Sequence, residues 1–176
     1  ADREIIPCNR PDYLDFQRAV DAASRDVSSA IRYLSGLNFI NESRIVVAGT
    51  SAGGFAAISA LPLVEEQVRA AISFNGGRCG SRGDAIGGLS FQQQIYSQVA
   101  GSTAVPVYFL GAGNDTVIPV YSTRTLFMAF CMARDDCVQR DKVQLYVENA
   151  GTHDVGSMLA SYRRALRQIS GTFDRL

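Results

Sequence analysis

The sequence lacks an excess of charge of either sign. Its 17 Lys and Arg residues balance 17 Asp and Glu residues, and neither kind forms a cluster or a tail. Without a basic patch, nucleic-acid binding has no electrostatic support. Uninterrupted apolar runs approaching the ~18 residues of a membrane-spanning helix are also missing, so no segment is expected to cross a membrane. The first residues, ADREIIPCNRPDY, lack the basic start and the apolar block of a signal peptide.

Cysteine and histidine are scarce, with four cysteines and one histidine. No second closely spaced pair accompanies Cys131 and Cys137, so no metal site is expected. A Cys131–Cys137 bridge would close a short loop and stabilise the fold by about 2 kcal/mol. By elimination Cys8 would face Cys79, although sequence alone does not fix the pairing. Two bridges favour an oxidising compartment, such as the periplasm or the exterior, and buried free thiols in a cytosolic protein are the alternative.

Repeats, low-complexity segments and linkers are absent too, so residues 1–176 are expected to form a single domain. Short β-branched runs alternate with segments of helical periodicity. Strands are expected over 44–48, 68–74, 105–110 and 143–147, and helices over 13–37, 52–61, 91–99, 121–131 and 157–169. Pro62 is expected to end the second of these helices. The alternation predicts an α/β fold with a parallel sheet and helices on both of its faces.

The stretch RIVVAGTSAGGFAAISAL, residues 44–61, contains a G-x-S-x-G match centred on Ser51. The pentapeptide alone is a weak signal, but a predicted strand precedes it and a predicted helix follows. That context is the geometry of a nucleophile elbow, a sharp turn that exposes a serine hydroxyl. Glycine at Gly49 and Gly53 would remove side chains that collide at such a turn. The helix would also point its free amino-terminal N–H groups at the same spot.

Polar residues follow the other predicted strands at the same edge of the sheet. Asn75, Asp115 and His153 each come just past the carboxyl end of a strand, as Ser51 does. Sites in open parallel sheets are built at that edge. A serine hydroxyl is a poor nucleophile until a base takes its proton, and His153 is the candidate base.

A third residue, a carboxylate, should orient the imidazole and stabilise its charged form. Asp115, in GAGNDTVIP after the third strand, is the preferred candidate. Asp84, in the glycine-rich loop after the second strand, is a rival. Asp154 is a weaker rival, because a side chain rarely reaches round to the ring of the adjacent residue.

Three stretches together resemble a known superfamily: DVSSAIRYLSGLNFINESRIVVAGTSAGGFAAISA, GAGNDTVIP and AGTHDVG. They are similar to the carboxyl-terminal two thirds of an α/β-hydrolase, in its dienelactone-hydrolase-like branch. The resemblance implies a Ser51, Asp115 and His153 triad, with the backbone N–H of Ala52 as the first oxyanion donor. Dienelactone hydrolase itself has cysteine at the elbow, so Ser51 implies a serine esterase, which needs no metal or cofactor.

Two alternatives to the esterase stay open. Serine peptidases of the prolyl-oligopeptidase kind share the elbow and the order of the triad, although they carry a large propeller domain of which this sequence has no trace. A non-catalytic binding or assembly subunit that kept the fold is the other alternative. For an esterase, activity should fall as the pH drops through about 6–7, because His153 must be neutral to act as a base.

The resemblance also implies parts that this chain does not contain. The family has three or four strands and an oxyanion-hole loop before the helix that begins near residue 13, and residues 1–12 cannot supply them. We therefore expect a fragment, a cleavage product or one half of a two-chain hydrolase, whose second chain supplies the missing amino-terminal strands and the second oxyanion donor. Otherwise the strand over 44–48 would be an apolar edge that invites pairing.

The walls of a substrate pocket are expected from residues 74–91 and 118–121, where Phe74 and Tyr121 either line the site or belong to the core. Arg78 and Arg82, in the same glycine-rich region, are expected to be solvated loop arginines rather than ligands of an anionic substrate.

Overall fold

A parallel sheet forms the centre of the computed structural model, which describes residues 7–135, 137, 142–149, 151–154 and 162–173. Its four strands are ordered β1-β2-β5-β6. Their bounds are Val46–Thr50 for β1, Ala70–Phe74 for β2, Val107–Ala112 for β5 and Val143–Glu148 for β6. All three neighbouring pairs are parallel, as the sequence predicts.

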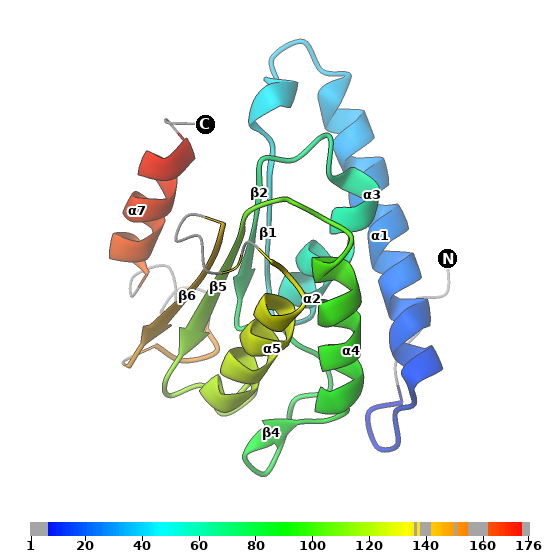
Figure 1. Cartoon of the computed structure of the whole chain (residues 1–176), viewed down its shortest axis with the longest axis vertical. Coiled ribbons are helices and arrows are strands. Elements are labelled where there is room, and N and C mark those ends of the chain that lie inside the picture. The colour runs from blue at the N-terminus through cyan, green and yellow to red at the C-terminus, as the bar shows by residue number, and fades with distance from the viewer. Residues whose placement is uncertain (1–6, 136, 138–141, 150, 155–161, 174–176) are drawn as a thin grey trace.

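Helices cover the sheet on both sides, which confirms the predicted α/β architecture (Figure 1). Helices α1 to α5 lie on one side and α7 lies on the other. The bounds on the first side are Tyr13–Ser35 for α1, Ala52–Ser59 for α2, Leu61–Val64 for α3, Leu89–Ala100 for α4 and Val120–Met132 for α5, and α7 spans Arg163–Phe173.

The central strands divide their side chains between two apolar clusters. Val107 and Phe109 of β5 belong to the cluster under helices α1 to α5, whereas Tyr108 and Leu110 pack with Tyr162 and α7 on the opposite face. Successive residues of a strand point to opposite faces, so a strand covered on both sides must be apolar throughout. This explains why β5, with every residue buried, reads as a continuous apolar run.

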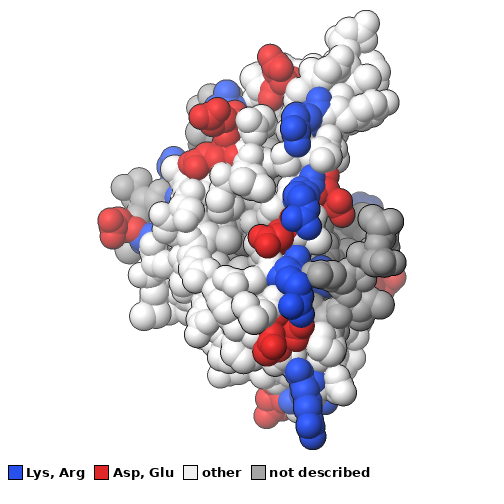
Figure 2. Space-filling view, turned by 90° about the vertical axis from the view of Figure 1, so that its right-hand side faces the viewer, with Lys and Arg blue, Asp and Glu red and all other residues white. Residues whose placement is uncertain are grey.

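Helix α1 is amphipathic and begins with a reciprocal cap. The Asp12 carboxylate accepts a hydrogen bond from the Asp15 N–H at 2.8 Å, and the Asp15 carboxylate accepts one from the Asp12 N–H at 3.0 Å. On the solvent side Arg18, Arg25 and Arg32 recur every seventh residue and are exposed. Figure 2 shows this side of the molecule, where acidic side chains interleave with the basic column. Charges of both signs make this face a solvated surface without a single-sign field.

Two of the boundaries that differ from those predicted have a clear local reason. Strand β1 begins at Val46 because Glu42–Arg44 form a 3-10 turn, capped by the Asn41 side chain accepting from the Ser43 N–H at 3.1 Å. The prediction that Pro62 ends the second helix is wrong. Helix α2 ends at Ser59, and Pro62 lies in the first turn of α3, where its missing N–H has no intrahelical partner to lose.

The glycine-rich loop after β2 contains a small antiparallel hairpin that the sequence pattern did not predict. It consists of β3, Ser81–Arg82, and β4, Ala85–Ile86. The expected last helix is observed as α7, and the expected residues 157–161 at its start lie outside the described residues.

All four cysteines are paired in disulfides, Cys8 with Cys79 and Cys131 with Cys137. The Cα atoms are 5.0 and 5.1 Å apart, and both pairs are those expected from the sequence. Within the described residues, no helix is long and apolar enough to cross a membrane.

Candidate active site

Ser51 occupies a sharp turn between β1 and α2. Its φ and ψ of 53° and −123° lie in a region that residues other than glycine rarely adopt. Hydrogen bonds from three directions hold this conformation: the Ser51 N–H donates to the Phe74 carbonyl at 3.0 Å, and the Ser51 carbonyl accepts from the N–H groups of Gly77 and Phe55 at 3.1 Å each. The turn thus has the strained geometry of a nucleophile elbow.

Close backbone contacts at the elbow depend on Gly49 and Gly54. A Cβ on Gly49 would lie 2.2 Å from the carbonyl carbon and oxygen of Gly53, and one on Gly54 would lie 2.8 Å from the Cα of Gly76. A Cβ on Gly53 itself would meet nothing within 4 Å. The expectation that Gly53 avoids a collision through its missing side chain is therefore wrong, because Gly53 contributes backbone to the contact and Gly49 must lack the side chain.

Ala52 is the first residue of α2 and is exposed. The first N–H groups of a helix have no carbonyl partner within that helix and carry its partial positive charge. The Ala52 N–H follows Ser51 directly and is the group that the resemblance to the α/β-hydrolases implies as the first oxyanion donor.

Asp115 and His153 form a hydrogen-bonded pair beyond the ends of β5 and β6. His153 Nδ1 lies 2.7 Å from Asp115 Oδ2, with the carboxyl side chain fully buried and the imidazole 28% exposed. The other oxygen, Asp115 Oδ1, accepts from the N–H groups of Val117 at 2.7 Å and Ile118 at 2.8 Å. Because a carboxylate only accepts, Nδ1 carries the proton in the neutral imidazole and Nε2 is left as a basic nitrogen.

The rival carboxylates have different surroundings. Asp84 is exposed at the β3–β4 hairpin and Asp154 is exposed beside the histidine, whereas Asp115 is buried against the ring. Among the described residues, no hydrogen bond joins the Ser51 hydroxyl to the imidazole of His153. Catalytic hydrogen bonds are often long in sites without substrate and tighten when substrate binds.

Asn75 is a part of the site for which no role was predicted from the sequence. It follows β2 directly, is fully buried, and has a left-handed φ of 43°. Its side-chain Nδ2 donates to Asp115 Oδ2 at 2.5 Å, and its Oδ1 accepts from the Ala112 N–H at 2.7 Å. The sequence offers one signal of this contact: an asparagine follows a buried strand directly, at the sheet edge where the serine elbow and the candidate acid are expected.

A cavity of about 750 Å³ opens beside Asp115. Its walls come from the β3–β4 hairpin and from the loop and first turn of α5. Ser81, Asp84, Val120 and Tyr121 lie within the segments expected to form the pocket, Thr116 lies outside them, and neither Ser51 nor His153 is among the lining residues. Tyr121 lines this cavity and is 58% exposed, so it does not belong to the core. Phe74 instead packs on Tyr162, with ring centroids 5.9 Å apart, and is part of the core.

Of the two loop arginines that were expected to be solvated, Arg78 is not and Arg82 is. Arg78 is half-buried with its guanidinium 5.5 Å from the centre of the Phe55 ring, and burial lowers its pKa. Its backbone is held by the buried amide of Gln92. Arg82 is exposed, as expected, and donates to the Cys8 carbonyl at 2.7 Å.

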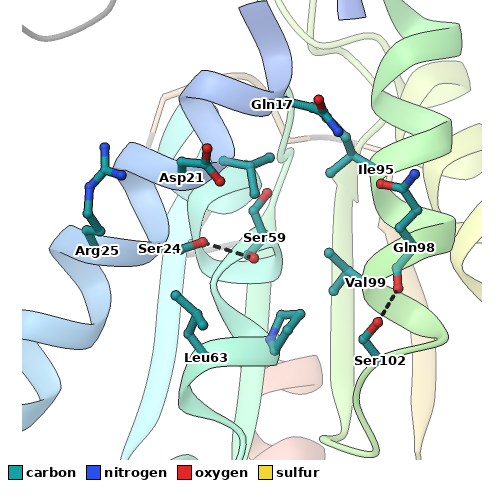
Figure 3. Close-up of a pocket in the computed structure, with 12 residues that line it drawn as sticks. Gln17, Asp21, Ser24, Arg25, Ser59, Leu63, Ile95, Gln98, Val99 and Ser102 are labelled. Carbon is teal, nitrogen blue, oxygen red and sulfur yellow. Dashed lines mark hydrogen bonds between the residues drawn. The ribbon is translucent and has the colours of Figure 1, made fainter. Parts of the chain in front are cut away.

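A second cavity, of about 450 Å³, lies between α1, α4 and the end of α2 (Figure 3). The Ser24 hydroxyl donates to the Ser59 carbonyl at 3.2 Å across it. Its lining includes none of Ser51, Asp115 and His153, so it is separate from the site at the ends of the strands.

The family model of the dienelactone hydrolase family matches residues 12–150. The chain belongs to this family. The match includes the elbow serine and Asp115 and ends just before His153. A comparison with curated proteins gives no match.

Solved structures with the same fold include esterases and peptidases. Esterase PE8 superposes with a TM-score of 0.63 and 16% identity, covering 93% of this chain and 68% of that one. A putative dipeptidyl aminopeptidase IV from Bacteroides ovatus gives a TM-score of 0.62 at 14% identity, covering 86% and 22% of the two chains. A puromycin-hydrolyzing peptidase of Mycobacterium tuberculosis gives a TM-score of 0.59 at 18% identity, covering 85% of this chain and 25% of that one. This chain thus spans about two thirds of the esterase and a quarter or less of each peptidase. At these identities the neighbours establish the α/β-hydrolase fold alone.

Proposed function

We propose that the protein is a serine hydrolase that cleaves a carboxylic ester through an acyl-enzyme on Ser51. The observation that carries this proposal is the 2.7 Å hydrogen bond between Asp115 and His153, beyond strands of the same sheet that presents Ser51 on a strained turn. Membership of the dienelactone hydrolase family supports it independently.

The proposed reaction has two halves. Ser51 Oγ attacks the ester carbonyl carbon while His153 Nε2 takes its proton, and the resulting oxyanion accepts a hydrogen bond from the Ala52 N–H. The imidazolium, stabilised by Asp115, then protonates the departing alcohol. Water, deprotonated in turn by His153, attacks the acyl-enzyme and releases the acid and the free serine. The proton transfers in these steps use only Ser51, His153 and water, and the second donor to the oxyanion is treated below.

Labelling with a fluorophosphonate probe tests the proposal, because only an activated serine reacts with it. We expect the wild-type protein and Ser102→Ala to label, and Ser51→Ala to stay unlabelled. Ser102 is a suitable control since its hydroxyl is exposed and bonded to the Gln98 carbonyl, away from the elbow. A folded wild-type protein that does not label would favour the non-catalytic binding or assembly subunit.

The choice of substrate separates an esterase from a peptidase. We expect turnover of a short-chain nitrophenyl ester and little turnover of a proline anilide. The reverse ranking would favour the prolyl-oligopeptidase kind of enzyme.

We also propose that a further strand pairs with β1 and brings the second oxyanion donor. β1 is the edge of the described sheet, and its burial supports the idea: Val46 and Val47 are only partly buried and Ala48 is exposed, whereas β2 is almost fully buried. An apolar strand of this kind invites pairing. Intact mass and solution size of the natively purified protein test this, since a second chain or further polypeptide adds mass. A structure in which residues 1–6 cover the edge would contradict it.

A further inference from the structure

Asn75, directly after β2, forms hydrogen bonds both to the end of β5 and to Asp115, the candidate acid. Its backbone N–H donates to the Leu110 carbonyl at 2.8 Å, and its side-chain oxygen accepts from the Ala112 N–H at 2.7 Å. Because a backbone N–H can only donate, the oxygen of the amide must face Ala112, and the NH₂ group must face Asp115. The orientation of the side-chain amide is thus set by β5 and does not depend on His153.

Asp115 Oδ2 accepts from both Asn75 Nδ2 and His153 Nδ1, while its Oδ1 accepts from two backbone N–H groups. A carboxylate has about four lone-pair sites, so all of them are used. Rotation of the carboxyl group about its Cβ–Cγ bond would break bonds at both oxygens. Since the side chain is fully buried, no water would replace them.

We propose that Asn75 is a positioning residue, which fixes Asp115 Oδ2 so that His153 keeps its proton on Nδ1 and its base on Nε2. This inference rests on the proposed function. Asparagine suits the position for three reasons: it offers an acceptor and a donor on one short branch, it tolerates the left-handed φ of 43°, and it adds no charge beside the acid. Aspartate at this position would place its carboxyl group against that of Asp115. Glycine would adopt the left-handed φ but would leave Asp115 Oδ2 with one hydrogen-bond donor fewer.

Two variants test the proposal without requiring a new backbone conformation. Asn75→Gly keeps the left-handed φ and deletes the amide, whereas Asn75→Asp keeps the shape and replaces the donor by an acceptor. Ser59→Ala is the matched stability control, because it removes a buried hydrogen bond within α2, to the Phe55 carbonyl at 2.7 Å, away from the acid.

The decisive readout is the imidazole itself. The chain has one histidine, so every imidazole signal in a ¹⁵N NMR spectrum comes from His153. We expect a protected Nδ1 proton and an unprotonated Nε2 in the wild type and in Ser59→Ala. In Asn75→Gly the Nδ1 proton should exchange faster and shift upfield. On the nitrophenyl ester its kcat should fall about 10- to 100-fold with little change in KM.

Asn75→Asp should lose more activity than Asn75→Gly at alkaline pH. Its activity relative to wild type should rise as the pH falls, because the two neighbouring carboxyl groups then share a proton that restores a donor. Folded Asn75 variants with the wild-type imidazole spectrum and the wild-type kcat would overturn the inference. Failure of the proposed function looks different: Ser51→Ala would then keep its activity, while the imidazole spectra would still report whether Asn75 orders the Asp115–His153 pair.

Discussion

Gly49 and Gly53 approach so closely that a Cβ built on Gly49 would lie 2.2 Å from the Gly53 carbonyl carbon. The reverse is not true, since a Cβ on Gly53 meets open space. This close packing of the two glycine backbones lets α2 leave β1 at a sharp angle, with Ser51 at the turn.

The two glycines should therefore respond in opposite ways to alanine. Gly49→Ala should lower the free energy of unfolding by about 1–3 kcal/mol or more, because α2 must move away from β1. Gly53→Ala should leave it unchanged or raise it by up to about 1 kcal/mol, because alanine is the better helix former. Urea denaturation of both variants measures the difference, and equal destabilisation would contradict the asymmetry.

Asp115→Asn should lower kcat on the nitrophenyl ester by about 10⁴-fold, because an amide cannot accept the Nδ1 proton in the way that the carboxylate does. The variant keeps the size of the side chain, so a melting curve should show it folded. Asp154→Asn, at the exposed neighbour of the histidine, should stay near wild-type activity. If it lost as much activity as Asp115→Asn, the assignment of the acid would be wrong.

The two disulfides should differ in their effect on stability. Residues 8 and 79 are 71 apart and residues 131 and 137 are 6 apart. In the loop-entropy account, replacing the first pair by serine should cost about 4 kcal/mol and replacing the second about 2 kcal/mol. Denaturation of the two double variants gives the comparison.

Mass spectrometry tests whether the bridges form in the natural protein, and with them the proposed oxidising compartment. Alkylation without reductant should leave the mass unchanged, and alkylation after reduction should modify all four cysteines. Full alkylation without reductant would instead indicate buried free thiols in a cytosolic protein.

Gln92 is a buried amide that bonds the glycine-rich loop, accepting from the Arg78 N–H at 3.0 Å and donating to the carbonyls of Arg78 and Gly87 at 3.1 and 3.0 Å. Gln92→Leu should leave these backbone groups without a partner and cost about 1–3 kcal/mol. Thermal unfolding measures this cost. Since Gln92 does not touch Asp115, the NMR signals of His153 should be retained, and their loss would contradict a role confined to the loop.

The fold could be predicted because each element has a strong local pattern. Continuous apolar runs identified β2 and β5, and helical spacing of apolar residues identified α1. The predictions failed where the local pattern is ambiguous or too short to read. Pro62 is a helix breaker by propensity but sits in a first turn that tolerates it, and the hairpin at Ser81–Ile86 is too short to show an alternation.

The site was predictable to the level of loops. Sequence order placed Ser51, Asp115 and His153 after parallel strands of one sheet, and the structure brings Asp115 and His153, which follow the neighbouring strands β5 and β6, within hydrogen-bonding distance. The Asn75 contact could not be derived, because it depends on how the ends of β2 and β5 align across the sheet. That residues 1–176 form a single domain stays a prediction, which one cooperative unfolding transition would support.

The Cys8–Cys79 bridge closes the backbone into a covalent ring that contains β1, α2 and β2, and so both Ser51 and Asn75. A protease that nicks any exposed bond inside this ring cannot separate the two pieces, because the crosslink still joins them. Nicked protein should therefore run at its full mass on a non-reducing gel and split only after reduction. Through this ring, the segment before α1 keeps Ser51 and Asn75 in one molecule after limited proteolysis.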